Sequence, residues 1–148
     1  YKYSGFNYKM SNLNASIGYP QIKLFKVLLK KKISIAIMYD KAFKLISKFT
    51  PMPRSIDIKS SCWLYSLKMS SRKDARSLIN FLKYKNIESR LFWESLSSQK
   101  PYKNYTTISN KVSSNLSGRV VNLPCSTSLT EEDQKTVIKE TLNWVKIN

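Results

Sequence analysis

The side chains best suited to binding chemistry lie in two separated segments of the chain. Asn7 lies in a polar loop four residues before Ser11, and its neutral amide carries two donors that suit a phosphate oxygen. Arg90 can hold a carboxylate or another anion through its planar guanidinium, and Ser97 and Ser98 offer hydroxyl groups in a polar stretch. For each of them the simpler alternative is a local role, in which the side chain satisfies only its own loop or a neighbouring carboxylate.

The residue types that the chain lacks argue against several kinds of site. It contains no histidine, and its two cysteines are Cys62 and Cys125. Structural zinc lacks its four Cys or His ligands here, and a Ser-His or Cys-His triad lacks its histidine. We expect two buried free thiols in a reducing compartment, with one disulfide as the alternative. Because no apolar run approaches the roughly 20 residues of a membrane span, we expect a cytoplasmic protein without a membrane partner.

The charge of the chain raises a second class of function. The 148 residues carry 26 Lys and Arg against 9 Asp and Glu, a net charge of +17. Because phosphate neutralisation needs such cations, a small basic nucleic-acid-binding protein is one interpretation. The basic residues are mostly lysines scattered along the chain, however, and the aromatic residues fall on apolar stripes. A basic but ordinary surface is the interpretation that we favour, which makes nucleic acid the weaker partner hypothesis.

The first part of the chain is predicted to form a loop followed by helix. Ser11 is expected to cap a short helix over residues 12–18. Pro20 then predicts a kink or break near Gly18–Pro20, or else it occupies the first turn of the next helix. That helix has an apolar stripe, which predicts packing on a domain or a partner subunit, with a basic membrane-surface helix as the alternative. The stripe consists of Ile22, Phe25, Leu29, Ile33, Ala36, Tyr39, Phe43 and Ile46, before residues 50–53 end the helix.

The later residues alternate between strand and helix patterns. Period-two alternation predicts the strands, and Ser71 and Thr130 are expected to cap the two helices. The predicted elements are a strand at 62–69, a helix from 71, a turn at 85–86, a strand at 87–92, a polar loop at 94–118 with a short helix near 107–115, a strand at 119–123 and a helix from 130. We therefore predict an α+β fold, in which a long N-terminal helix joins a small sheet with helices on one face.

Three blocks of sequence are similar to motifs of one enzyme family. Residues 5–18 read GFNYKMSNLNASIG and resemble the GYNYRMSNLQAAIG-type segment of the DegT-type sugar aminotransferases. Residues 86–102, which include NIESRLFW, LSS and PY, resemble the GIESRPFFYPLSS…PY segment of the perosamine-synthase type. Residues 121–134 resemble the family ending NLPS…SLTEEDQ. Because the blocks keep their order and comparable spacing, the resemblance extends along the whole chain.

This resemblance implies a fold, a cofactor and site residues. The chain is similar to the carboxy-terminal part of a type I pyridoxal-phosphate enzyme, with residues 1–50 as interface loop and linking helix and residues 51–148 as the small α+β domain. Such an enzyme takes an amino donor and a 4-keto sugar on a nucleotide carrier as its partners. The resemblance also implies a homodimer, in which Asn7 contacts the cofactor phosphate of the neighbouring subunit. The substrate-binding residues that it implies are Tyr8, Lys9, Arg90, Ser97 and Ser98.

Some positions depart from the family pattern. Lys9 stands where the motif has Arg, which keeps the charge but loses the bidentate fork. Asn86 stands for a Gly, and both residues tolerate a left-handed turn, while Leu91 stands for a Pro. None of the lysines matches the Schiff-base motif, which in the family precedes the segment that corresponds to residue 1. We therefore expect this chain alone to be inactive, with a degenerate non-catalytic remnant as a further alternative.

Overall fold

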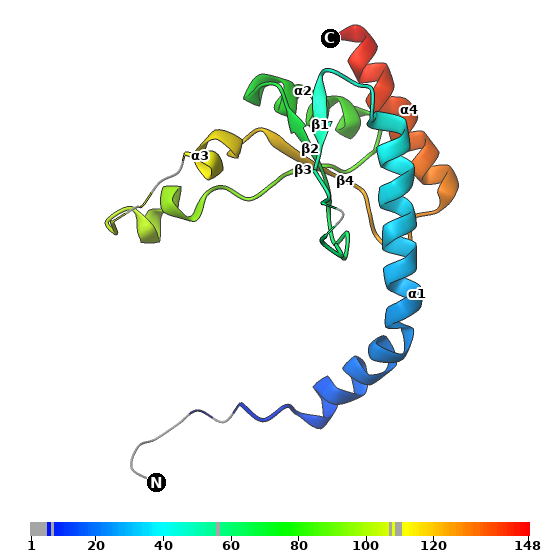
Figure 1. The fold of residues 1–148 in the computed structure, drawn as a ribbon, viewed down its shortest axis with the longest axis vertical. Coiled ribbons are helices and arrows are strands. Elements are labelled where there is room, and N and C mark those ends of the chain that lie inside the picture. Colours follow the sequence, from blue (N-terminus) through cyan, green and yellow to red (C-terminus); the bar gives the residue numbers. More distant parts are fainter. Residues whose placement is uncertain (1–5, 7, 56, 107, 109–110) are drawn as a thin grey trace.

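The computed structural model describes residues 6, 8–55, 57–106, 108 and 111–148 as a projecting helical arm and a body built on a small sheet (Figure 1). The predicted α+β fold with a long N-terminal helix is confirmed. In chain order the elements are α1 (Asn12–Phe43), β1 (Phe49–Pro51), β2 (Tyr65–Met69), α2 (Arg72–Tyr84), β3 (Arg90–Leu91), η1 (Leu96–Ser98), η2 (Lys100–Tyr102), α3 (Val112–Leu116), β4 (Val120–Leu123) and α4 (Glu131–Ile147).

The sheet is antiparallel and has the strand order β1-β2-β4-β3. Its register places Leu67 on β2 between Pro51 on β1 and Val121 on β4. Strand β1 corrects the prediction, which made residues 50–53 a helix end and connector. A strand of three residues has too short a pattern to be recognised alone, and it exists here through its pairing with β2. Its Pro51 is tolerated because β1 is an edge strand, where one side of the backbone needs no partner.

The core lies between one face of the sheet and the helices α1, α2 and α4. The predicted strand at 62–69 is confirmed only over Tyr65–Met69, where Tyr65, Leu67 and Met69 point to this face and are buried, whereas residues 62–64 are not part of the strand and Trp63 is 66% exposed. The last turns of α1 supply Tyr39 and Phe43, which are also fully buried. The helices contribute the remaining large buried side chains, Leu78, Leu82 and Trp144.

Two tyrosines join α1 to the sheet. Tyr39 donates its hydroxyl to Pro124 O at 2.8 Å, and Tyr65 donates to Asp40 Oδ1 at 2.9 Å, where Arg54 also pairs with Asp40. Burial raises the pKa of both hydroxyls well above its usual value. Both groups therefore remain protonated donors at neutral pH, and the end of α1 is fixed on the body.

Three predicted helix caps are present. In each case a Ser or Thr hydroxyl accepts the backbone N–H three residues later, which satisfies one of the unpaired donors of the first turn. The acceptor and donor residues are Ser11 and Asn14 at 3.2 Å, Ser71 and Asp74 at 3.0 Å, and Thr130 and Asp133 at 3.0 Å.

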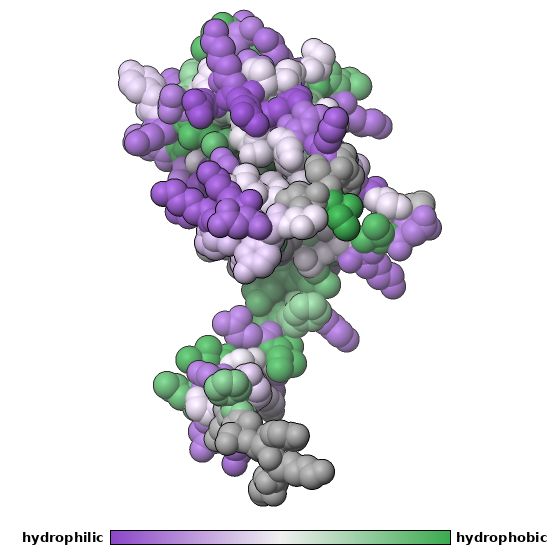
Figure 2. Space-filling view, turned by 90° about the vertical axis from the view of Figure 1, so that its left-hand side faces the viewer, coloured by the Kyte–Doolittle hydropathy of each residue, from purple (hydrophilic) through white to green (hydrophobic). Residues whose placement is uncertain are grey.

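Helix α1 corrects the prediction of two helices. It runs without a break from Asn12 to Phe43 with Pro20 inside it, and Figure 1 shows its axis turning in the first half of the helix. Because a proline has no N–H for the helical hydrogen bond, a bend is its usual result inside a helix. The predicted apolar stripe is buried only at its end, since Ile22 is 75% exposed and Phe25 is 59% exposed. Figure 2 shows hydrophobic residues gathered on this projecting part, below the more hydrophilic body.

The connections also differ in part from the prediction. The turn at Asn86 is confirmed by its left-handed backbone, with φ of 57°, but β3 covers only Arg90–Leu91 of the predicted strand 87–92. The loop 94–118 contains η1, η2 and the short helix α3. Both cysteines are free, as predicted, although Cys125 is only half-buried. Among the described helices, none combines the length and apolarity that crossing a membrane requires.

Candidate functional site

A cavity of about 660 Å³ lies on the face of the sheet that the core helices leave uncovered. Residues of β1, β2 and β4 form its floor, and the segment after β3 together with α3 forms its walls. Its lining is mainly apolar with a few hydroxyl groups and two charged residues, which is the usual composition of a site for a small organic molecule. The lining residues used below are Ser66, Lys68, Phe92, Trp93, Glu94 and Ser95.

Strand register aligns polar side chains on this free face. Ser66 lies directly opposite Asn122, and Asn122 lies opposite Arg90, so the three residues form one row across β2, β4 and β3. Ser66 is buried and donates its hydroxyl to Asn122 Oδ1 at 2.7 Å. Because paired residues of neighbouring strands share a face, the row carries Arg90 to the cavity side of the sheet. Backbone pairing thus holds Arg90 on the cavity side of the sheet, although Arg90 is not one of the residues that line the cavity.

The guanidinium of Arg90 has a carboxylate partner two residues earlier in the chain, just before β3. Its Nε and Nη2 donate to Glu88 Oε1 at 2.9 and 2.5 Å, while the two side chains are 77% and 72% exposed. This is the neighbouring carboxylate that one of the two predicted roles requires. An ion pair so exposed contributes little stability, so a second anion can compete for the guanidinium at small cost.

Ser97 and Ser98 belong to a tight turn at the cavity wall. The Ser97 and Ser95 hydroxyl oxygens lie 2.7 Å apart, and Ser98 Oγ donates to Ser95 O at 2.7 Å. Ser95 itself lines the cavity. In this structure the two predicted serines therefore shape the 3-10 turn η1, and they reach the cavity through Ser95.

An aromatic wall was missed by the sequence-based site prediction. Phe92 and Trp93 line the cavity, with ring centroids 4.9 Å apart in an edge-to-face pair. Trp93 also stacks on Trp63 at 5.6 Å between centroids, and its side chain remains 62% exposed. A partly exposed stacked indole offers a flat surface to a ring of a ligand. The signal in the sequence was the pair of aromatic residues that directly follows Arg90-Leu91.

The predicted residues of the N-terminal segment do not join this cavity. Tyr8 is 88% exposed, and its ring lies 6.0 Å from that of Phe6. Figure 1 shows this segment at the far end of α1, away from the sheet that holds Arg90 and Ser97. Lys9 lies in the same segment, and Asn7 lies outside the described residues. Within one chain, Arg90, Ser97 and Ser98 thus belong to the body that holds the cavity, whereas Tyr8 and Lys9 lie apart from it.

The described residues do not by themselves make a complete pyridoxal-phosphate site. Such a site needs a lysine free to attack a carbonyl and a carboxylate that holds the pyridine ring. Lys68 and Glu94 both line the cavity, but no ion pair joins them in the part of the chain that the structure describes. Lys32 is half-buried, yet its ammonium is engaged by Trp63 O and Cys125 O at 2.6 Å each, which ties α1 to two loops. The cavity suits a small organic ligand by its lining.

Solved structures with the same arrangement of elements are aminotransferases. Helicobacter pylori PseC, an aminotransferase involved in the biosynthesis of pseudoaminic acid, matches with a TM-score of 0.87 and 22% identity, covering 99% of this chain and 40% of its own. DesV of S. venezuelae, solved with a ketimine intermediate, matches with a TM-score of 0.88 and 13% identity, covering 98% and 39%. At these identities the likeness establishes the fold, which is that of the corresponding part of a sugar aminotransferase.

The sequence identifies the family directly. Residues 1–142 match the DegT/DnrJ/EryC1/StrS aminotransferase family, and the chain therefore belongs to this family. Similar curated proteins are EpsN of Bacillus subtilis, named as a pyridoxal phosphate-dependent aminotransferase (27% identical over 143 residues), and GDP-perosamine synthase of Escherichia coli O157:H7 (28% over 139 residues). Each match covers 94% of this chain and 37% of the relative, so the chain spans little more than a third of their length. The resemblance found in the three sequence blocks is confirmed, and pyridoxal phosphate is the cofactor of this class.

Proposed function

We propose that this chain is the carboxy-terminal part of a pyridoxal-phosphate aminotransferase that aminates a 4-keto sugar on a nucleotide carrier. The observation that carries the proposal is the collinear family match over residues 1–142, joined to relatives that are named as GDP-perosamine synthases. In this proposal the rest of the enzyme supplies the Schiff-base lysine, and the chain alone is inactive. The reaction belongs to amino-sugar synthesis in the cytoplasm and uses a separate amino donor.

The cavity on the free face of the sheet is the part of the chain that we assign to the nucleotide-linked sugar. Trp93 offers a flat face to a ring, and Arg90 can leave Glu88 for a pyrophosphate oxygen because the pair is exposed. Ser97 and Ser98 hold the turn that shapes the wall beside Ser95. These residues bind and orient the substrate, and the cofactor, when bound, supplies the electron sink for amino transfer.

The projecting half of α1 supports a homodimeric enzyme in which residues 1–50 serve as interface and residues 51–148 as the small domain. Exposed apolar side chains follow one another along this half and the segment before it. Soluble proteins rarely leave so long a row of them uncovered, so the larger part of the enzyme or its second subunit is the natural cover. The exposed residues are Phe6, Tyr8, Met10, Leu13, Ile17, Tyr19, Ile22, Leu24, Phe25 and Val27.

The dimer proposal gives Asn7, Tyr8 and Lys9 a place at the site of the neighbouring subunit. Asn7 then offers its amide to the cofactor phosphate just before the start of α1, where the exposed backbone N–H groups also favour an anion. Lys9 adds a positive charge, and Tyr8 adds a ring that either stacks or packs. None of these residues needs to approach Arg90 of its own chain.

The test uses the protein produced together with the segment encoded upstream of Tyr1. We expect that protein to transfer an amino group to a 4-keto sugar nucleotide with added pyridoxal phosphate. Asn7→Ala should weaken cofactor affinity about tenfold, the size of one lost charge-assisted hydrogen bond. Asn80→Ala, an exposed amide on α2, is the matched control and should change nothing. Absence of turnover in a folded, cofactor-loaded protein would overturn the proposed reaction, and equal cofactor affinity in the Asn7 variant would overturn its assigned role.

A further inference from the structure

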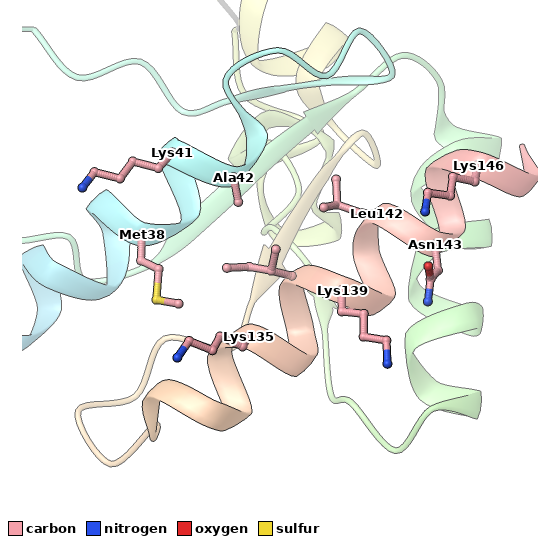
Figure 3. Close-up of a pocket in the computed structure, with 9 residues that line it drawn as sticks. Met38, Lys41, Ala42, Lys135, Lys139, Leu142, Asn143 and Lys146 are labelled. Carbon is pink, nitrogen blue, oxygen red and sulfur yellow. The ribbon is translucent and has the colours of Figure 1, made fainter.

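A second surface feature lies on the opposite side of the core from the cavity. The end of α1 and the middle of α4 form a shallow groove of about 560 Å³ (Figure 3). Its floor is apolar and half-buried, whereas the lysines on its rims are exposed. The floor residues are Met38, Ala42, Ile138 and Leu142, and the rim lysines are Lys41, Lys135, Lys139 and Lys146.

The positive charge of this groove is not neutralised by the groove itself, because its lining contains no carboxylate among the described residues. The nearby acids are engaged elsewhere. Glu131 pairs with Lys135 at 2.8 Å on the exposed surface, Glu140 lies 3.9 Å from Lys85, and Asp40 pairs with Arg54 on the sheet side of α1. Within the described part of the chain, Lys41, Lys139 and Lys146 have no acidic partner. Three lysines thus gather beside an apolar strip without local compensation.

We propose that this groove docks an acidic amphipathic helix of another protein. Apolar side chains of such a helix would fill the strip between α1 and α4, and its carboxylates would meet the lysines on both rims. Lys135, Lys139 and Lys146 follow one side of α4 at helical spacing, and Lys41 stands on α1 across the groove, as Figure 3 shows. This is the helix-in-groove mode of recognition combined with charge complementarity.

Other occupants fit the geometry less well. A membrane surface needs apolar side chains that protrude beyond the basic ones, whereas here Met38 and Leu142 are half-buried below exposed lysines. Nucleic acid gains nothing from an apolar floor. A second copy of this chain that docked by the same groove would place its rim lysines against these lysines, which is unfavourable. Because the groove lies on the outer side of α1 and α4, a bound helix leaves the free face of the sheet open.

The probe is a fluorescent synthetic peptide of about five helical turns, with Leu at spacings of three and four residues and Glu between them. Its binding to the 148-residue chain is followed by fluorescence anisotropy at physiological salt, beside a scrambled peptide of the same composition. Circular dichroism melts confirm that each variant remains folded. Vesicles of phosphatidylcholine with phosphatidylglycerol test the membrane alternative by co-sedimentation.

The variants separate the groove from the general charge. The double variant Lys41→Glu/Lys139→Glu should weaken peptide binding at least about tenfold. Its matched control, Lys59→Glu/Lys100→Glu, makes the same change in net charge at exposed positions outside the groove lining and should weaken binding less than about threefold. Met38→Ser should also weaken binding, about threefold to fivefold, without changing the charge.

Three results would overturn the proposal. The first is equal loss of binding in both charge-reversal pairs, which would mean that only diffuse charge attracts the peptide. The second is equal affinity for the scrambled peptide, which would remove the requirement for an amphipathic helix. The third is vesicle binding that depends on Lys41 and Lys139 while the peptide does not bind, which would assign the groove to a lipid surface.

Discussion

The apolar stripe of α1 runs through both halves of the helix, but it is buried in one half and exposed in the other. In the half that ends at Phe43, the stripe is buried against the sheet and α4, and Tyr39 and Phe43 have no exposed surface. In the half that begins at Asn12, Ile22, Phe25 and Val27 remain more than half exposed. Because burial of apolar surface is the main stabilising term, only the second half of α1 is stabilised by this chain.

This difference separates what the chain can do alone from what it needs others to do. The body has a continuous core, a paired sheet and capped helices, so its fold is explained by its own residues. The arm has a capped helix and an uncovered stripe, so its conformation depends on whatever covers it. Helical propensity alone holds an isolated helix only marginally.

The largest expected difference in stability is between two variants that each truncate one phenylalanine, one in each half of α1. Phe43 is fully buried among the rings of Tyr39, Phe49 and Tyr65, at centroid distances of 5.7, 5.4 and 6.4 Å. Phe43→Ala should lower the free energy of unfolding by about 3–5 kcal/mol, measured by urea denaturation of the 148-residue chain. Phe25→Ala, made in the same helix, should change it by less than about 0.5 kcal/mol.

The two phenylalanine variants can also be compared in a protein that includes the upstream part of the enzyme. There Phe25→Ala should become costly, because its ring is then covered, and Phe43→Ala should cost as much as before. Equal losses for both variants in the 148-residue chain would show that the arm is already packed there, contrary to the structure.

The features of the body that were predicted from sequence share one property. Each rests on residues that are close together in the chain, such as the Ser71 and Thr130 caps, the alternation from Tyr65 to Met69 and the left-handed turn at Asn86. Local chemistry decides these features, and a single sequence contains it. Strand β1 depends on its pairing with β2, which is distant in sequence, and the prediction missed it. The predicted boundary between two helices near Pro20 was also wrong, because the surrounding helix continues through the proline.

The helix caps should differ in their effect on stability in the same way as the two phenylalanines: caps in the body should matter, and the cap in the arm should not. Ser71→Ala and Thr130→Ala each remove a hydroxyl acceptor from a helix of the core and should together cost about 2 kcal/mol of unfolding free energy. Ser11→Ala removes the equivalent acceptor from the arm and should leave the main unfolding transition unchanged. Circular dichroism of the three variants during urea titration checks both statements. A shift of the midpoint by Ser11→Ala would mean that the arm unfolds together with the body.

In the candidate site, too, some features were predictable from local sequence and others depend on contacts between distant residues. Arg90, Ser97 and Ser98 came from a recognised sequence block, and the residues that line the cavity are their chain neighbours Phe92, Trp93, Glu94 and Ser95. The cavity itself, with Lys68 and Ser66 on its floor, is created by strand register between residues some fifty positions apart. Tyr8 and Lys9 lie at the other end of α1, and Asn7 lies outside the described residues. The roles of all six residues as site residues stay predictions.

A smaller effect should appear at alkaline pH. Burial raises the folded-state pKa of Tyr39 above its ordinary value of 10.0, so the unfolded chain loses this proton first as pH rises. The stabilisation is therefore complete below about pH 10 and declines above it. The parent should lose about 1 kcal/mol more than Tyr39→Phe between about pH 9.5 and pH 11, measured by denaturation at each pH. Parallel pH profiles would show that Tyr39 ionises equally in both states.

The most direct test of the central claim is the location of the lysine that binds pyridoxal phosphate. Borohydride reduction followed by peptide mass spectrometry identifies that lysine in the 148-residue chain and in the protein that includes the upstream segment. We predict no stoichiometric adduct at any single lysine in the 148-residue chain, and one adduct in the longer protein, at a residue before Tyr1. A single stoichiometric adduct within residues 1–148, together with turnover of a 4-keto sugar nucleotide, would contradict the account.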